Sequence, residues 1–316
     1  VVAPTAYLQN SQNVSCFGGM NGTALIGITG GNSPYTYTLN GGTPQASNFF
    51  AALPAAAYTA LVTDVNGCTA STSFTITSPT QLTYTTVMTP VTCNGLCDGS
   101  IAVTPNGGTA PYSFSKNNGA TFSTSNPITA LCAGTVNLVV QDANGCLANS
   151  TVIITQPTAV SATATTVDPV CNNICGGQIT VSAAGGVAGY SYSVSGGAFQ
   201  ASPVLTNVCP GTQQYIVQDG NGCQFTQNVT LANPPEIVTS QTSMVESNCG
   251  FNNGSLEVTA TGVNPPFQYS LNGAPYQANG IYTNLYGGAY IVTVQDALGC
   301  VDSTYFGVND VEMDGI

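Results

Sequence analysis

Cysteine and aspartate are the residues of this sequence whose types and spacing could do chemistry. Of the twelve cysteines, four close a recurring Asp-x-x-Gly-Cys motif. Each motif cysteine follows an early cysteine by 51 to 53 residues, the early ones being Cys16, Cys93, Cys171 and Cys249 and the motif ones Cys68, Cys146, Cys223 and Cys300. A chain without histidine cannot form the mixed cysteine and histidine sites that zinc prefers. The cysteines therefore indicate disulfides and an oxidising, extracellular compartment.

The repeat spacing predicts which cysteines pair. Two of the four copies carry two extra cysteines and the other two copies lack both, as expected if the extra cysteines are bonded to each other. We predict four disulfides inside single copies and two additional ones: Cys16–Cys68, Cys93–Cys146, Cys171–Cys223, Cys249–Cys300, Cys97–Cys132 and Cys175–Cys209. Closing a loop of about 53 residues would stabilise a small module by roughly 4 kcal/mol. The alternative, redox or metal pairs at Cys93 with Cys97 and at Cys171 with Cys175, is disfavoured because no cation adjoins them to lower a thiol pKa.

The sequence argues against catalysis. A serine or cysteine nucleophile needs a base such as histidine, and the chain has none. The single lysine, Lys116, cannot supply an isopeptide cross-link to every copy. Carboxylates are scattered, so a pair for glycoside hydrolysis would have to be assembled from distant residues. We therefore predict that the chain is not an enzyme and has no catalytic or cofactor-binding residues.

Two acidic stretches resemble parts of calcium loops. The motif supplies one recurrent carboxylate in each copy, so we favour an aspartate that closes its own turn. Near the end of the sequence, Asp310, Glu312 and Asp314 alternate as at the start of an EF-hand loop, although an acidic strand or linker is favoured. In Asp302-Ser303-Thr304, Ser303 matches the acceptor of a short O-glycosylation motif.

Charge and hydropathy exclude several classes of partner. The 316 residues carry 13 acidic side chains against one cation, a net charge of -12. Nucleic-acid backbones and anionic lipid surfaces are bound by clustered lysine and arginine, and no apolar stretch reaches the roughly 18 residues of a membrane span. We therefore predict neither nucleic-acid binding nor membrane insertion. With 43% hydrophobic residues in alternating runs, the chain is also too apolar to be disordered.

The motif recurs every 77 or 78 residues, so the chain is a tandem array. Each copy contains short alternating apolar runs separated by glycine- and asparagine-rich turns, without helical periodicity. The pattern predicts an all-β fold of four disulfide-bonded, immunoglobulin-like β-sandwich modules of about 77 residues. Prolines indicate the limits of the modules: 1–79, which begins in the last strand of a preceding module, then 80–157, 158–234 and 235–309, with 310–316 opening the next segment.

Strand parity predicts the geometry of the motif. Val62 and Phe74 share an apolar face only if the aspartate and the cysteine stand opposite each other across a three-residue loop. Such a loop is a type I turn followed by a glycine bulge, with the glycine left-handed. The turn residues of the four copies are Asp64, Gly67, Asp142, Gly145, Asp219, Gly222, Asp296 and Gly299. We expect this turn to direct each cysteine into the core of its own module.

The order of these motifs resembles a known family. The motifs follow one another in this order: an early cysteine, Asn-Gly or Asp-Gly, Gly-Gly-x-x-Pro-Tyr-x-Tyr, Leu-x-x-Gly-x-Tyr and Asp-x-Asn-Gly-Cys. This order is similar to that of the SprB-repeat modules of large Bacteroidota cell-surface adhesins, most clearly from Val91 through Pro111 to Cys146. The resemblance implies a secreted surface filament that acts in adhesion, in some members in gliding motility, and that is exported by the type 9 secretion system. The sequence departs from the pattern in having no tryptophan and in placing Leu298 where the other copies have asparagine.

Together these features predict a structural or adhesive repeat region, a rigid disulfide-locked stalk at the outer cell surface. Its expected partners are neighbouring modules of the same chain and extracellular glycans, surfaces or like filaments. One alternative is a carbohydrate-binding array, in which Tyr35, Tyr112 and Tyr190 would stack on sugar rings, although their period-two placement favours a core role. Another is an accessory region of a larger extracellular enzyme. No cofactor is expected, with calcium as the ion that the acidic stretches leave open.

Overall fold

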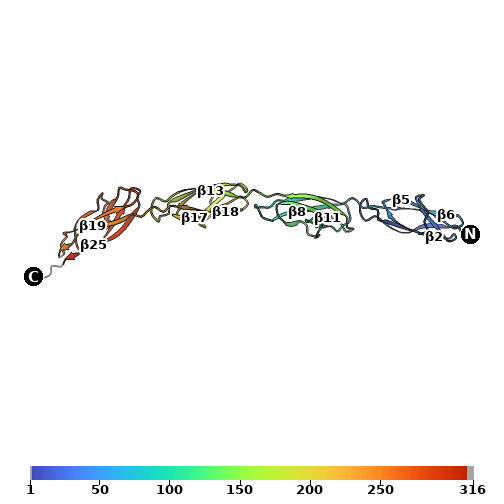
Figure 1. Cartoon of the computed structure of the whole chain (residues 1–316), viewed down its shortest axis with the longest axis horizontal. Coiled ribbons are helices and arrows are strands. Elements are labelled where there is room, and N and C mark those ends of the chain that lie inside the picture. The colour runs from blue at the N-terminus through green and yellow to red at the C-terminus, as the bar shows by residue number, and fades with distance from the viewer. Residues whose placement is uncertain (1, 249, 312–316) are drawn as a thin grey trace. The chain divides into compact units, whose positions relative to one another are not determined.

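The computed structural model describes residues 2–248 and 250–311, which form β-strands joined by turns and irregular loops (Figure 1). No helix long and apolar enough to cross a membrane occurs in these residues. The chain divides into two compact units, Val1–Pro157 and Thr158–Ile316. Each unit contains two of the predicted modules.

Unit 1 holds the first two modules, and its strands follow the alternating apolar runs of the sequence. The strands of the first module are β1 (Thr5–Gln12), β2 (Gly22–Thr29), β3 (Thr36–Leu39), β4 (Phe49–Leu53), β5 (Ala56–Thr63) and β6 (Thr69–Ile76). Those of the second are β7 (Thr83–Thr89), β8 (Gly99–Asn106), β9 (Ser113–Ser115), β10 (Ile128–Leu131), β11 (Gly134–Gln141) and β12 (Leu147–Ile154).

Unit 2 repeats the pattern. The strands of the third module are β13 (Ser161–Val167), β14 (Gly177–Ala184), β15 (Ser191–Val194), β16 (Val204–Val208), β17 (Gly211–Gln218) and β18 (Gln224–Leu231). Those of the fourth are β19 (Val238–Val245), β20 (Ser247–Asn248), β21 (Gly254–Thr261), β22 (Gln268–Leu271), β23 (Ile281–Leu285), β24 (Gly288–Gln295), β25 (Val301–Val308) and β26 (Asp310–Val311). The short strands β20 and β26 pair in parallel, an addition specific to the fourth module.

Each module has the strand order of an immunoglobulin-like sandwich. In the first module one antiparallel sheet has the order β1-β2-β4 and the other the order β3-β5-β6. The same order recurs as β7-β8-β10 with β9-β11-β12, as β13-β14-β16 with β15-β17-β18, and as β19-β21-β23 with β22-β24-β25. With strand D omitted, this is the A-B-E and C-F-G arrangement of immunoglobulin-like domains. The predicted all-β, immunoglobulin-like class is confirmed.

Apolar residues that alternate along the strands fill the space between the two sheets of each module. Buried side chains gather in four separate clusters, and every cluster draws on both sheets of one module. Two positions are fully buried in every copy, one on the second strand and one on the strand before the motif: Ile26, Ile101, Ile179, Leu256, Val62, Val140, Val217 and Val294. A core of this size supports a domain only marginally, which gives covalent bonds a large share of the stability. The exact limits of the modules stay predictions.

The two ends of a sandwich differ in what they carry. In the first module the turn after β1, which contains Cys16, lies beside the end of β6, because the Val14 N–H donates to the Thr77 carbonyl at 3.2 Å. We call this the early-cysteine end. At the opposite end, which we call the hairpin-tip end, the Asn32 N–H donates to Asp64 Oδ2 at 3.1 Å. The eight-residue strand β5 connects the two ends and spans roughly 26 Å.

Candidate functional site at the module junctions

The hairpin tip adopts the predicted turn. In the first module the Asp64 N–H donates to the Cys68 carbonyl at 2.9 Å and the Gly67 N–H donates to the Asp64 carbonyl at 3.0 Å, which leaves a three-residue loop. The glycine is left-handed in every copy, with φ from +81° to +86°: Gly67, Gly145, Gly222 and Gly299. The type I turn with a glycine bulge is therefore confirmed. The fourth copy tolerates Leu298 because this position of a type I turn does not require a positive φ.

The motif aspartate is buried and its carboxylate is occupied by the turn. Asp64 Oδ1 accepts the N–H groups of Asn66 and Cys68, both at 2.9 Å. In each of the other copies the equivalent oxygen accepts the same two backbone donors: Asp142, Asp219 and Asp296. The four side chains are between 4% and 7% exposed. The aspartate closes its own turn, as the favoured interpretation of the sequence has it.

These hydrogen bonds lower the pKa of two of the aspartates, Asp64 and Asp219. The N–H groups of Asn32 and then Cys68 hold the pKa of Asp64 below its usual value. Burial raises the pKa of Asp219, but the backbone donors, led by Val187, outweigh burial and lower the pKa overall. The fold therefore stabilises the ionised form of Asp64 and of Asp219.

We expect the chain to lose stability in acid. Asp64 and Asp219 have a lower pKa in the folded chain than in the unfolded chain, where an aspartate titrates near about 3.9. Their contribution is fully present above the unfolded pKa and is lost as the pH falls through the folded pKa values. Melting temperatures measured by circular dichroism should stay level from pH 7 to 5 and fall below about pH 4. The Asp64→Asn and Asp219→Asn variants should melt lower at pH 7 and show a shallower acid decline; identical acid profiles for variants and wild type would contradict this assignment.

The disulfides only partly match the predicted pairs. Cys97–Cys132 and Cys175–Cys209 are present as predicted. Two motif cysteines instead bond to the early cysteine of the preceding module, in Cys16–Cys146 and Cys171–Cys300, which span 130 and 129 residues. The predicted pairs Cys16–Cys68, Cys93–Cys146, Cys171–Cys223 and Cys249–Cys300 are therefore wrong, Cys249 itself lying outside the described residues. Cys68 is an exposed free thiol, and both Cys93 and Cys223 are disulfide-bonded.

The length of the sandwich explains the correction. Cys16 lies at the early-cysteine end and Cys68 at the hairpin-tip end, separated by the eight residues of β5 or roughly 26 Å. A disulfide needs Cα atoms within about 7 Å, so a module cannot close this bond on itself. Cys97 and Cys132, in contrast, both lie at the early-cysteine end, with their Cα atoms 3.8 Å apart.

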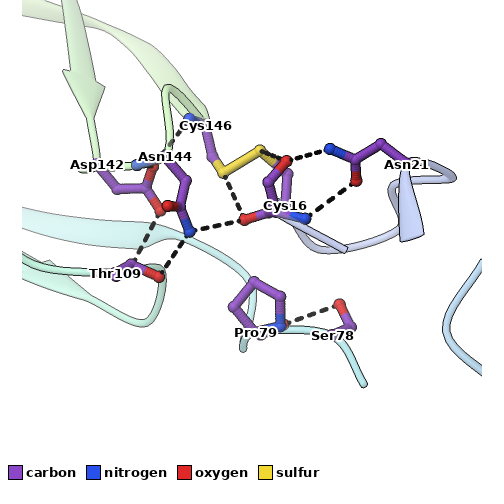
Figure 2. The surroundings of a disulfide bond; sticks show 9 residues. Cys16, Asn21, Ser78, Pro79, Thr109, Asp142, Asn144 and Cys146 are labelled. Carbon is purple, nitrogen blue, oxygen red and sulfur yellow. Dashed lines mark hydrogen bonds between the residues drawn. A yellow bond between two sulfur atoms is a disulfide. The ribbon is translucent and has the colours of Figure 1, made fainter. Parts of the chain in front are cut away.

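Figure 2 shows the junction between the first and second modules. The Cys16–Cys146 disulfide joins the turn after β1 to the hairpin tip between β11 and β12, with 5.6 Å between the Cα atoms. From the same tip, Asn144 Nδ2 donates to the Ser15 carbonyl of the first module at 3.1 Å and to Thr109 Oγ1 of its own module at 3.0 Å. Asn144 thus ties the tip to its supporting loop and to the neighbouring module.

The turn that receives this tip is held by Asn21. The Ser15 N–H donates to Asn21 Oδ1 at 3.0 Å, and Asn21 Nδ2 donates to Ser15 Oγ at 2.7 Å. This arrangement leaves the Ser15 carbonyl facing the second module, where it lies 3.3 Å from Cys146 Sγ. The peptide linker, residues 77–82, is also short. The first and second modules are therefore connected twice, by six residues of chain and by a disulfide.

Unit 2 has the same kind of junction. The Cys171–Cys300 disulfide joins the third module to the hairpin tip of the fourth, with 5.4 Å between the Cα atoms. Cys300 is only 7% exposed, and its Sγ lies 3.6 Å from the Val170 carbonyl. Leu298 has no side-chain amide to donate, so the contact that Asn144 makes in unit 1 has no counterpart here. The disulfide, rather than the asparagine, is the feature that the two junctions share.

The sequence interpretation missed Ser15, Asn21 and Asn144 as junction residues. It also placed every motif cysteine in the core of its own module, which is wrong for the exposed Cys68. Cys300 does lie with the core cluster of the fourth module, although it bonds to Cys171 of the third. A signal for the correct pairing is present, because Cys16, Cys93 and Cys171 are each followed by the motif cysteine of the next module at 129 or 130 residues, as regularly as by their own at 52 or 53 residues. The spacing alone does not distinguish the two registers.

The remaining candidate residues lie away from the junctions. Ser303 is exposed on β25, with its Oγ 2.9 Å from Thr293 Oγ1, and its glycosylation stays a prediction. Asp310 Oδ1 accepts the Ser247 hydroxyl at 3.0 Å, whereas Glu312 and Asp314 lie outside the described residues. Among residues 2–248 and 250–311, no three histidine, cysteine or acidic side chains are grouped so that they could hold a metal ion.

The tyrosines considered for sugar binding brace a loop instead. Tyr35 and Tyr112 are partly buried, and their hydroxyls donate to the Gly30 and Gly107 carbonyls at 3.0 and 2.8 Å. Tyr190 makes the equivalent bond to the Gly185 carbonyl. Each tyrosine therefore supports the double-glycine loop that packs against the hairpin tip, consistent with the favoured core role.

One family model matches the chain. The SprB repeat matches residues 8–44, 85–121, 163–199 and 242–275, one match in each module. No curated protein matches the sequence.

Several solved structures show a remote likeness. Invasin, described as a bacterial integrin-binding protein, is 16% identical, with 98% of this chain and 80% of that chain covered at a TM-score of 0.42. A Ca2+-stabilised adhesin of an ice-binding Antarctic bacterium is 16% identical, with 98% and 99% covered at a TM-score of 0.38. The N-terminal eight immunoglobulin domains of Down syndrome cell adhesion molecule are 10% identical, with 98% of this chain but 48% of that chain covered at a TM-score of 0.28. At these TM-scores the likeness carries no argument about function.

Proposed function

Because this chain belongs to the SprB-repeat family, we propose that it is the stalk region of a secreted bacterial cell-surface adhesin. In this role it has no catalytic activity and carries tension between the cell and the part of the adhesin that binds a surface. The observation that supports the proposal is that Cys16–Cys146 and Cys171–Cys300 join consecutive modules instead of closing single ones. An oxidising environment outside the cell would keep these bonds formed.

The covalent path explains why such bonds suit a stalk. Tension applied to the two ends of the chain reaches Cys16 and passes through the disulfide to Cys146, so that the segment between them is bypassed. The Cys171–Cys300 bond bypasses a second segment of 129 residues in the same way. The strands of all four cores lie largely inside the bypassed segments. Pulling the stalk therefore loads directly only one strand of each sandwich, β1, β12, β13 and β25, and cannot extend the bypassed remainder.

The family supports the cellular setting of the proposal. An SprB-repeat stalk would be exported by the type 9 secretion system and would act in surface adhesion, including adhesion during gliding motility. Its partners would be the neighbouring modules of the same chain and, at the binding part, extracellular glycans or other surfaces. The net charge of -12 would keep neighbouring stalks apart in solution.

Detachment of cells under flow tests the proposal. A chain in which Cys16, Cys146, Cys171 and Cys300 are all replaced by serine loses both junction bonds, and its cells should detach at lower shear than wild type. The matched control replaces Cys97, Cys132, Cys175 and Cys209, which removes the same number of bonds without altering a junction. Surface amounts of the three chains would be equalised with an antibody. Equal detachment of the junction variant and wild type would overturn the proposed role.

A further inference from the structure

The second module contains a surface hollow of about 270 Å³. It is lined by the side chains of Phe114 on β9, of Lys116 directly after that strand, and of Phe122, Ser123 and Ser125 in the loop that follows. Of these lining residues, Phe114 is buried, Phe122 is partly buried, and Lys116 is exposed. The hollow thus combines aromatic surface, hydroxyl groups and one positive charge.

In the other three modules a glutamine side chain occupies the equivalent place. An isolated bridge pairs this glutamine with the aromatic residue of the third sandwich strand, in Tyr37 with Gln45, Tyr192 with Gln200 and Tyr269 with Gln277. The glutamine Nε2 then donates to two backbone carbonyls, two and four residues further along the chain, at distances from 2.7 to 3.1 Å. The loop is thereby closed over its own backbone.

In the second module the glutamine is replaced by serine. Ser123 forms the same backbone bridge with Phe114, at 2.8 and 2.9 Å, so the alignment of the four loops is unambiguous. The Ser123 hydroxyl is too short to reach both carbonyls and instead accepts the Ser125 N–H at 3.1 Å. The equivalent carbonyls, those of Ser125 and Pro127, therefore have no glutamine amide to bind. The hollow is lined by Ser123 and Ser125, so it lies where the missing side chain would begin.

The positive charge is specific to the same module. Lys116 is the only cation in a chain with 13 acidic residues. It stands two residues after Phe114, at the position that Leu39, Val194 and Leu271 hold in the other modules. An apolar residue has thus been replaced by a cation in the one module that also lost the glutamine. Two independent departures from the repeat pattern meet in one hollow.

We propose that this hollow binds a carboxylated monosaccharide unit, such as a uronic acid residue of an acidic glycan. The Lys116 ammonium pairs with the sugar carboxylate, and the single cation matches a single anionic group in a chain that is otherwise acidic. The Phe122 ring offers an apolar face to the sugar ring. The Ser125 carbonyl, left without a glutamine partner at the edge of the hollow, accepts a hydrogen bond from a sugar hydroxyl, which leaves fewer polar groups unpaired in the complex. This activity goes beyond the stalk function and does not depend on the junction disulfides.

The lone lysine makes the test unusually direct. Chain labelled with 15N-lysine gives one backbone amide resonance from Lys116, which is followed during titration with glucuronic acid and, separately, with glucose. We expect a saturating shift with glucuronic acid and at least a tenfold weaker response with glucose. Saturation-transfer NMR on unlabelled ligand extends the measurement to variants that lack the lysine.

Two variants restore the pattern of the other modules. Ser123→Gln refills the hollow and Lys116→Leu removes the charge, and each should weaken glucuronic acid binding at least tenfold. Both substitutions introduce residues that sister modules already accommodate, so folding should be retained, and the melting temperature checks this. Gln200→Ser, which opens the equivalent loop of the third module without supplying a cation, should leave binding unchanged. Undiminished binding by Ser123→Gln or Lys116→Leu, equal binding of glucose, or no binding of glucuronic acid would overturn the proposal and would leave the stalk function untouched.

Discussion

Pulled by its two ends in a single-molecule force experiment, the fully unfolded but oxidised chain should extend to roughly 200 Å, whereas the reduced chain should extend to roughly 1100 Å. The reason is the covalent path through Cys16–Cys146 and Cys171–Cys300, whose separations of 130 and 129 residues are removed from the length under tension. Only residues 1–16, 146–171 and 300–316 then carry the load. The difference in extended length between the oxidised and the reduced chain therefore shows directly whether the junction disulfides are formed.

The same experiment discriminates between the two pairing schemes. Disulfides inside single modules would shorten the chain less and would leave roughly 380 Å under tension. Replacing Cys97, Cys132, Cys175 and Cys209 by serine should not change the oxidised length, because both bonds lie inside segments that the junction bonds already bypass. An oxidised length near 380 Å, or one that grows in this control variant, would contradict the bypass.

Gly186→Ala should strongly destabilise the third module, by roughly 2 to 4 kcal/mol. The glycine has φ of +60°, and an added Cβ would lie 2.3 Å from Asp219 Oδ2, the carboxylate oxygen that accepts the Val187 N–H at 2.8 Å. The substitution therefore adds strain to a left-handed position and also displaces the aspartate that closes the hairpin tip. Because a multi-module chain does not unfold in two states, amide hydrogen exchange along β17 and β18 is the suitable measurement.

Gly196→Ala is the matched control in the same module. This glycine also has a positive φ, +74°, but nothing lies within 4 Å of an added Cβ. Only the backbone strain remains, so we expect a loss of roughly 1 kcal/mol. If the amide hydrogens of β17 and β18 exchanged at equal rates in the two variants, the clash with Asp219 would add nothing to the loss of stability. The proposed role of the Asp219 carboxylate in holding the hairpin tip would then be contradicted.

The strands and the hairpin tip could be predicted from the sequence because both depend on local patterns. Alternation along each strand places Val62 and its equivalents in the core, and they are fully buried. The same parity gave the three-residue loop between Asp64 and Cys68, which the hydrogen bonds confirm. Sheet order and the left-handed glycine follow from turn chemistry and from the immunoglobulin-like pattern of short strands.

The disulfide pairing could not be predicted from the same patterns. In a tandem array, the repeat pattern identifies which positions form disulfides but not which copies supply them, because three of the four early cysteines, Cys16, Cys93 and Cys171, have a motif cysteine at two regular distances. The choice depends on where the chain enters and leaves a sandwich, and that is a property of the folded module. The alternation of side chains along the strands predicts which face of the hairpin Cys68 lies on. At the tip, however, this face extends beyond the end of the core, so Cys68 is exposed.

The hollow of the second module illustrates another limit of sequence reasoning. In the sequence Lys116 is only an isolated cation, and Ser123 does not stand out as a binding residue. Nothing in the sequence indicates that the two residues lie together. The bridge between Phe114 and Ser123 aligns this loop with the glutamine loops of the sister modules and makes both departures visible. Comparison between copies within one chain here substitutes for comparison between related proteins.

Disulfide mapping of the unreduced chain tests the central claim most directly. The protein would be alkylated, digested with pepsin at low pH to prevent exchange, and sequenced by mass spectrometry, with every cross-linked pair of peptides assigned. We predict a peptide containing Cys16 linked to one containing Cys146, a second pair linking Cys171 to Cys300, and an alkylated Cys68. Cys16 linked to Cys68 within the first module would contradict the account.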